Sequence, residues 1–256
     1  MAKIGVFDSG LGGLSIVDKL FRNAPNHSII YFGDTAHLPY GSKSVETVRD
    51  LSQKAINFLI AKDVDMIVVA CNTVSSVALP FLQQIYKLPV IGVVEAGVKA
   101  ALDTQAKSIG IIGTHNTIKS GRYQSLLLEI EPDLKIIGKE CPLFVSLVEE
   151  GMVEGKIPDL VVEHYLSELK GKVQALILGC THYPALGKTI AKYMGNDTKI
   201  ADASIKIIEY IKEHMEKEEK QVKHEFYVSD RVDNFQELSK LFLDKKIENA
   251  EIIKWV

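Results

Sequence analysis

The cysteine at position 180 stands where an unbroken apolar run stops. The run ALILG (175–179) is followed directly by Cys180, Thr181 and His182, three side chains that can share or exchange protons. A cysteine at the end of a buried strand is often only a small core residue. The alternative is that the strand positions a reactive thiol.

A second cysteine repeats this arrangement. Cys71 ends the run DMIVVAC (65–71), and the hydrogen-bonding residues Asn72 and Thr73 follow it. Because two cysteines occupy matching places and each precedes polar residues, packing alone is the weaker interpretation of the pair. Cys141, in KECPLF, has no such counterpart, and we interpret it as a buried structural residue.

Two thiols on opposite walls of one cleft suit the inversion of a carbon centre. A thiolate removes a proton from one face and a thiol returns a proton to the other, and the roles exchange in the reverse direction. An unperturbed thiol, with a pKa of about 8.5, is mostly protonated at neutral pH. Asp8 and His182, which also follow strands, are the candidates for assistance. Positioned proton transfer contributes about 10²- to 10⁴-fold, so donors must also stabilise the charge on the substrate.

Other uses of these cysteines are less favoured. Three widely spaced cysteines do not form a disulfide framework, and they fit a reducing compartment. A structural zinc site takes four ligands, usually in close pairs. We also expect Cys180 and His182 to point to opposite sides of an extended segment. The sequence therefore predicts no metal site.

The elements that must position these residues alternate along the chain. Helical patterns, such as 46–63 and 119–130, separate short apolar runs typical of strands buried on both faces of a parallel sheet. Strands alternating with helices predict an α/β fold. The predicted strands are 3–8, 28–34, 65–71, 88–96, 108–114, 134–138, 174–180 and 198–203.

The second set of runs repeats the first. IGVFDSG at 4 matches IGIIGTH at 109, and IIYFGD at 29 matches LKIIGK at 134, both offset by 105 residues. We predict two pseudo-symmetric α/β domains, each with a mainly parallel sheet flanked by helices, and an active site in the cleft between them. Ligands of such sheets bind beyond the carboxyl ends of the strands, where both cysteines would lie.

The domain boundaries follow from the repeat. Residues 1–97 and about 207–256 are expected to form the first domain, and residues 98–206 the second. The tail supplies a strand, HEFYVSD, and a helix, VDNFQELSKLFL, which we expect to pack on the first domain.

Other strand ends carry groups suited to an amino acid. FDSGLGGLSIV (7–17) lacks the patterns of nucleotide-binding loops, but its glycines let backbone N–H groups approach a carboxylate. The loop 33–44 offers Asp34, Tyr40 and Gly41, and the segment 113–120 offers the hydroxyls of Thr114 and Thr117. No cofactor motif is visible. A pyridoxal phosphate lysine stays open, although no lysine lies at a strand end.

The composition limits the class of protein. The chain has 256 residues, 46% of them hydrophobic and 25% charged, with a net charge of −3, so neither nucleic acid nor a membrane surface is an expected partner. No apolar run approaches the roughly 20 residues of a membrane helix, and the N-terminus does not resemble a signal peptide. We expect a cytoplasmic protein.

Six segments of the chain resemble the signature segments of glutamate racemase, in the aspartate/glutamate racemase family. They occur in the order of the family and reach from residue 3 to about 186. The segments are IGVFDSGLGGLSIV, YFGDTAHLPYGSKS, VVACNTVSSVAL, PVIGVVEAG, CPLFVSLVEEG and LILGCTHYPAL.

This resemblance implies cofactor-independent interconversion of L- and D-glutamate by a homodimer that supplies D-glutamate for peptidoglycan. The catalytic cysteines of the family fall on Cys71 and Cys180, and Asp8 and His182 match the residues that assist them. Asp34, Thr114 and Glu149 are looser candidates. The substrate contacts of the family fall on Asp8, Ser9, Tyr40, Gly41, Asn72, Thr73, Thr117, Thr181 and His182.

Departures from the family pattern lie outside the thiol segments. His37 stands where arginine is usual, Ala96 where proline is usual, and Ser146 where proline is frequent. These changes bear on loop shape and regulation more than on chemistry. A two-thiol racemase acting on aspartate or a hydantoin remains an alternative, as does a non-catalytic protein whose paired lobes bind an amino acid.

Overall fold

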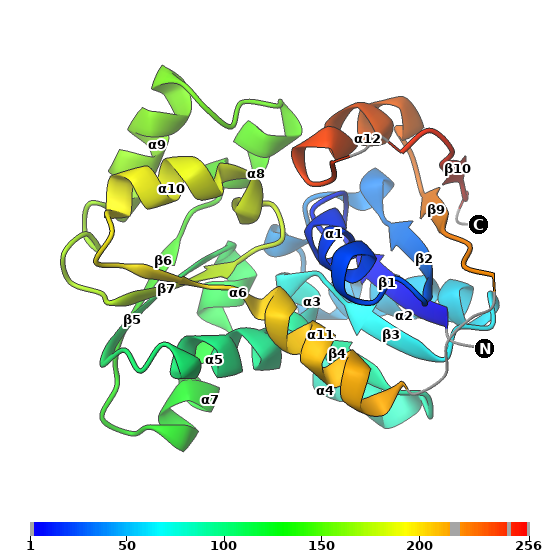
Figure 1. Cartoon of the computed structure of the whole chain (residues 1–256), viewed down its shortest axis with the longest axis horizontal. Coiled ribbons are helices and arrows are strands. Elements are labelled where there is room, and N and C mark those ends of the chain that lie inside the picture. The colour runs from blue at the N-terminus through cyan, green and yellow to red at the C-terminus, as the bar shows by residue number, and fades with distance from the viewer. Residues whose placement is uncertain (1–2, 216–220, 245–246, 255–256) are drawn as a thin grey trace.

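The computed structural model describes residues 3–215, 221–244 and 247–254 and contains two parallel sheets (Figure 1). The first sheet has the strand order β10-β9-β2-β1-β3-β4, and the second has the order β6-β5-β7-β8. The strands are β1 Lys3–Asp8, β2 Ser28–Gly33, β3 Met66–Val69, β4 Val90–Gly92, β5 Ser108–Gly113, β6 Lys135–Glu140, β7 Ala175–Gly179, β8 Lys199–Ala201, β9 Glu225–Val228 and β10 Glu251–Ile252.

The two sheets have the same internal order. β2-β1-β3-β4 of the first corresponds to β6-β5-β7-β8 of the second, and all neighbouring strands are parallel. The predicted fold class, two pseudo-symmetric α/β halves, is therefore confirmed. The central strands β1 and β5 each pair with the strand that precedes a cysteine, β3 and β7.

Helices cover both faces of each sheet. Successive residues of β2 alternate between two cores: Ile29 and Tyr31 pack with α1 and α11, whereas Ile30 and Phe32 pack with α2. Burial on both faces explains why the strands read as continuous apolar runs. The helices are α1 Leu14–Asn23, α2 Val45–Ile60, α3 Asn72–Val77, α4 Leu79–Ile85, α5 Val93–Asp103, α6 His115–Lys119, α7 Arg122–Ile130, α8 Leu143–Glu149, α9 Lys156–Leu166, α10 Gly187–Met194, α11 Ala203–His214 and α12 Val232–Leu238, with 3₁₀ turns η1 Thr35–His37, η2 Tyr40–Ser42, η3 Tyr183–Leu186 and η4 Ser239–Leu241.

Two predicted elements are wrong in extent. The expected strand 88–96 is only β4, and its second half begins α5, which is buried on most sides. A helix with so little exposed surface produces the same apolar run as a buried strand. The expected helix 119–130 begins only at Arg122, as α7; Lys119 is the last residue of α6, and the two helices are separated at Gly121, whose φ of 64° is left-handed.

The tail returns to the first sheet, as expected. β9 pairs with β2 and extends the sheet at that edge, and Phe235 of α12 is buried in the core around α1. In the part of the chain that the structure describes, no helix is both long and apolar enough to cross a membrane.

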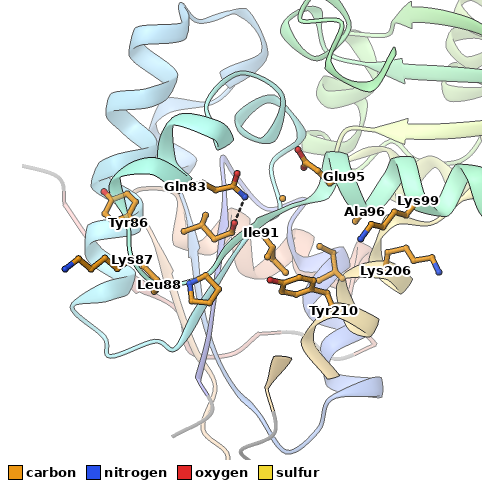
Figure 2. A pocket seen from close by; sticks show the side chains of 14 residues that line it. Gln83, Tyr86, Lys87, Leu88, Ile91, Glu95, Ala96, Lys99, Lys206 and Tyr210 are labelled. Atoms are coloured by element: carbon orange, nitrogen blue, oxygen red, sulfur yellow. Dashed lines mark hydrogen bonds between the residues drawn. The ribbon is translucent and has the colours of Figure 1, made fainter. Parts of the chain in front are cut away.

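The chain passes between the halves twice, through α5 and α11, which pack against each other (Figure 1). Beside this crossing lies a cavity of about 460 Å³ formed by residues of α4, β4, α5 and α11. Figure 2 shows the side chains of Lys99, Lys206 and Tyr210 on one side of it and Gln83 and Glu95 on another.

Candidate active site

A small cavity lies between the two halves and contains both repeated cysteines. Its volume is about 20 Å³, roughly the room that one water molecule needs. Ten of its lining residues were singled out from the sequence. The lining comprises Ser9, Leu38, Pro39, Tyr40, Gly41, Cys71, Asn72 and Thr73 from the first half and Thr114, Val145, Cys180, Thr181 and His182 from the second.

Cys71 occupies the N-cap of α3, two residues beyond β3. Its thiol donates to the hydroxyl of Ser9 over 3.2 Å. Burial, together with the charges of Asp8 and Cys180, raises the pKa of Cys71 to about 12, although Ser9 and the Val74 amide lower it. In this closed arrangement the Cys71 thiol therefore keeps its proton at neutral pH.

Cys180 has a different partner. Its sulfur lies 3.8 Å from Nδ1 of His182, and Nε2 of the same ring lies 2.6 Å from a carboxylate oxygen of Glu149. Burial lowers the pKa of His182, but the hydrogen bonds to Cys180 and Glu149 outweigh burial and raise the pKa to about 10. The ring is thus an imidazolium at neutral pH, and its positive charge lies beside the Cys180 sulfur.

The expectation that Cys180 and His182 point to opposite sides is wrong. β7 ends at Gly179, and the chain then turns, with Tyr183 N–H donating to the carbonyl of Cys180. His182 has helical dihedral angles (φ −75°, ψ −30°) at the start of η3. The segment is therefore not extended, and the turn brings the two side chains together.

Asp8 joins the two halves at the end of β1. It is fully buried; one carboxylate oxygen accepts from the hydroxyl of Thr181 over 3.2 Å and the other accepts from the Gly10 amide over 3.0 Å. Burial raises the pKa of Asp8, while His182 and the amides of Gly13 and Gly10 lower it, and burial prevails. Asp8 does not line the cavity among its described residues, and Ser9 makes the direct contact with Cys71.

Asp34 lies outside the cavity and supports its wall. The buried carboxylate accepts from the hydroxyls of Tyr40 and Ser229, each over 2.6 Å, and lies 2.8 Å from Nδ1 of His37. The hydroxyl of Ser229 also accepts from the Ala36 amide over 2.8 Å. The C-terminal end of β9 thus holds the loop that carries Tyr40.

A chain of hydroxyls crosses between the halves. The hydroxyl of Thr73 lies 3.0 Å from that of Thr114, which in turn lies 3.0 Å from that of Thr117. Thr117 is fully buried and does not line the cavity, so its contact with the cavity runs through Thr114. Glu149 likewise reaches the site through His182.

Tyr123 and Ser229 are two contributors that sequence reasoning missed. The Tyr123 hydroxyl donates to Oδ1 of Asn72 over 2.7 Å, and Ser229 contacts Asp34. Both residues lie far along the chain from their partners, and no local motif marks them. One signal for Tyr123 was its place in the chain, a few residues after Thr114 and Thr117.

The described residues offer no cluster of three or more His, Cys, Asp or Glu side chains arranged to hold a metal ion. The cavity walls consist of two thiols, hydroxyls, one amide and one imidazole, with apolar Leu38, Pro39 and Val145. Such a set can donate hydrogen bonds to a carboxylate and can move protons at two sulfurs that line one cavity.

Comparisons with known proteins place this chain in a family. The family model described as Asp/Glu/Hydantoin racemase matches residues 4–217. A glutamate racemase of Aquifex aeolicus (strain VF5) is 47% identical over 247 residues, which cover 96% of each chain.

Solved structures give the same result. The crystal structure of glutamate racemase from Francisella tularensis in complex with D-glutamate is similar with a TM-score of 0.91 and 39% identity, covering 99% of this chain and 97% of that one. The glutamate racemase from Aquifex pyrophilus is similar with a TM-score of 0.83 and 44% identity, covering 97% and 98%. With the family model covering most of its length, this chain belongs to the Asp/Glu/Hydantoin racemase family and is an amino-acid racemase.

Proposed function

We propose that this protein interconverts L- and D-glutamate without a cofactor, using Cys71 and Cys180 as the two proton-transfer groups. The observation that carries the proposal is that both thiols line one cavity, each from the carboxyl end of the equivalent strand of its half. The substrate is taken from the relatives, which are glutamate racemases at up to 47% identity.

The reaction begins with one sulfur as thiolate and the other as thiol. The thiolate takes the α-proton, and the electron pair left on the α-carbon delocalises into the adjacent carboxylate, which makes that carbon planar. The second thiol then gives its proton to the opposite face, so the amino acid leaves inverted. The thiol and thiolate have exchanged roles, and the reverse reaction restores them.

The surroundings of the two sulfurs support one of them as the proton acceptor and the other as the proton donor. The imidazolium of His182 lies beside the Cys180 sulfur and would stabilise a negative charge there, whereas the raised pKa of Cys71 keeps that thiol protonated. This arrangement is ready for abstraction by Cys180 and donation by Cys71. Asp8 and His182 are the proposed assisting groups, and Glu149 holds the imidazole through its second nitrogen.

The remaining lining residues would bind the substrate. Asn72, Thr73 and Thr181 line the cavity that contains both sulfurs, and their donors would stabilise charge that develops on the α-carboxylate. Ser9, Tyr40, Gly41 and His182 line the same cavity. Asp34, Thr114 and Thr117 support these walls through the hydrogen bonds described above.

The proposal extends to the role of the protein in the cell. D-Glutamate is a building block of bacterial peptidoglycan, and we propose that this racemase supplies it in the cytoplasm, as a homodimer. The net charge of −3 gives no support to a nucleic-acid partner.

The test is the uptake of deuterium at the α-carbon in deuterated water, with L-glutamate and L-aspartate supplied separately. We expect uptake and inversion with glutamate and at most trace uptake with aspartate. Cys180→Ser should lose turnover by at least about 10²-fold, the range of positioned proton transfer, while still binding glutamate. Cys141→Ala is the matched control, because Cys141 is buried but does not line the cavity.

Two outcomes would contradict the proposal. Uptake with aspartate alone would assign a different substrate to the same two thiols. Unchanged turnover in Cys180→Ser would remove the two-thiol mechanism itself.

A further inference from the structure

Asn72 receives a hydrogen bond from the opposite half of the molecule. The hydroxyl of Tyr123, at the start of α7, donates to its Oδ1 over 2.7 Å. Tyr123 is 1% exposed, and Asn72 directly follows Cys71 in the chain. The bond therefore links the second half to the residue beside one of the two thiols.

This bond fixes which end of the amide faces the cavity. Burial raises the pKa of Tyr123, so its hydroxyl keeps its proton, and among the described residues Oδ1 of Asn72 is the acceptor it contacts. Rotating the amide by 180° would leave a buried hydroxyl proton without an acceptor, which is unfavourable. Nδ2 of Asn72 donates to no described residue and is free to bind a carboxylate.

Two glycines leave room for the tyrosine ring to pack closely. A Cβ added at Gly97 of α5 would lie 3.0 Å from the Tyr123 hydroxyl, and one added at Gly179 would lie 3.5 Å from the ring carbon Cε2. Gly179 directly precedes Cys180. The ring thus lies against the segment of one thiol and hydrogen-bonds to the segment of the other.

We infer that Tyr123 is a positioning residue that orients the Asn72 amide so that Nδ2 donates to the substrate carboxylate. This inference rests on the proposed function, in which Asn72 binds the substrate. Because Tyr123 and Asn72 belong to different halves, separation of the halves breaks the hydrogen bond. Orientation of the amide is therefore coupled to closure of the site around the amino acid.

The test is a double-mutant cycle on kcat/KM for glutamate with Tyr123→Phe and Asn72→Ala. Tyr123→Phe removes only the hydroxyl, and we expect kcat/KM to fall roughly 5- to 100-fold, the range for a buried polar group that loses its partner. In the Asn72→Ala background the same change should alter kcat/KM less than about twofold, because its target is gone. A merely structural role would instead lower kcat/KM and thermal stability by similar factors in both backgrounds.

The chain offers a control in Tyr86, whose hydroxyl donates to Oδ1 of Asn57 over 2.9 Å and which does not line the cavity that contains the two cysteines. Tyr86→Phe removes the same kind of hydrogen bond and should leave kcat/KM unchanged. A second variant, Gly97→Ala, displaces the Tyr123 hydroxyl while keeping the phenol, and it should lower kcat/KM in the same direction.

The outcomes separate this inference from the proposed function. Wild-type racemisation combined with equal effects of Tyr123→Phe in both backgrounds would overturn the role of Tyr123 alone. An active wild-type protein whose Tyr123→Phe and Gly97→Ala variants both keep its kcat/KM would also overturn the role of Tyr123 alone. Absence of glutamate racemisation by the wild-type protein would overturn the proposed function and the inference together.

Discussion

The two cysteines occupy equivalent positions but have different neighbours. Cys71 contacts a hydroxyl, that of Ser9, whereas Cys180 contacts an imidazole that is itself bound to Glu149. The strand ends made both thiols and His182 predictable from the sequence. Their contacts were not, because the turn after Gly179 decides which way His182 points and no pattern of residue types fixes that turn.

The raised pKa of His182 predicts a pH dependence of stability. The ordinary pKa is 6.5 and the folded value is about 10, so the folded state binds a proton that the unfolded state has lost. The resulting stabilisation is full below pH 6.5 and is lost as the pH rises towards 10. We expect the free energy of unfolding to fall on the order of 1 kcal/mol per pH unit in that window.

Urea unfolding at pH values between about 6.5 and 8.5 measures this slope. This range stays below the ordinary pKa of 9.0 of Cys71, so titration of that thiol in the unfolded state adds little to the slope. Glu149→Gln removes the carboxylate partner of His182 and should flatten the slope. An identical slope in the wild type and in Glu149→Gln would show that this pair does not hold the proton.

At the scale of elements, the loop between β2 and α2 is held by hydrogen bonds to residues far away in the sequence. Ser229 and Asp230, which follow β9, bond to Asp34, Ala36 and Thr35. The sequence predicted the tail strand and its return to the first half, since its apolar pattern is local. It did not predict this contact, because nothing in HEFYVSD indicates which strand β9 pairs with.

Ser229→Ala should weaken substrate binding without touching the thiols. Asp34 loses a donor and the Ala36 amide loses an acceptor, so we expect a several-fold rise in KM and a loss of about 1–3 kcal/mol in the free energy of unfolding. Ser167→Ala, at the exposed end of α9, is the control and should change neither quantity. An unchanged KM in Ser229→Ala would mean that the loop keeps Tyr40 in place alone.

The wrong extent of the expected strand 88–96 has a physical cause. β4 and α5 form a continuous apolar run because α5 is buried between the two halves. Periodicity distinguishes helix from strand only where one face meets water. Strands β1, β2, β3, β5 and β7 lie within or at their predicted bounds, because turn residues or charged residues end each of those runs.

At the scale of the whole molecule, the halves approach so closely that only glycine fits at some contacts. A Cβ added at Gly12 would lie 2.5 Å from the Thr181 hydroxyl and 2.8 Å from the His182 amide nitrogen. The boundaries expected near residues 97 and 207 fall inside α5 and α11, the two helices that pack together at the crossing. This division stays a prediction.

Gly12→Ala should therefore separate the two walls of the site. A displacement of about 1 Å can lower the rate of a positioned reaction by 10²-fold, and we expect a loss of that size in kcat/KM with an unchanged circular dichroism spectrum. Gly187→Ala is the control: it begins α10, has helical dihedral angles and meets nothing within 4 Å, so it should retain activity. Full activity in Gly12→Ala would show that the halves can yield at this contact.

The cavity of about 20 Å³ sets a condition on every catalytic cycle. Glutamate does not fit in so small a space, so we expect the two halves to separate when a substrate molecule enters and again when the product leaves. Both enantiomers would enter and leave by the same opening, so the rate of opening would set an upper limit on kcat in each direction. A higher solvent viscosity slows such large-scale motion, so it would lower this limit on kcat in both directions.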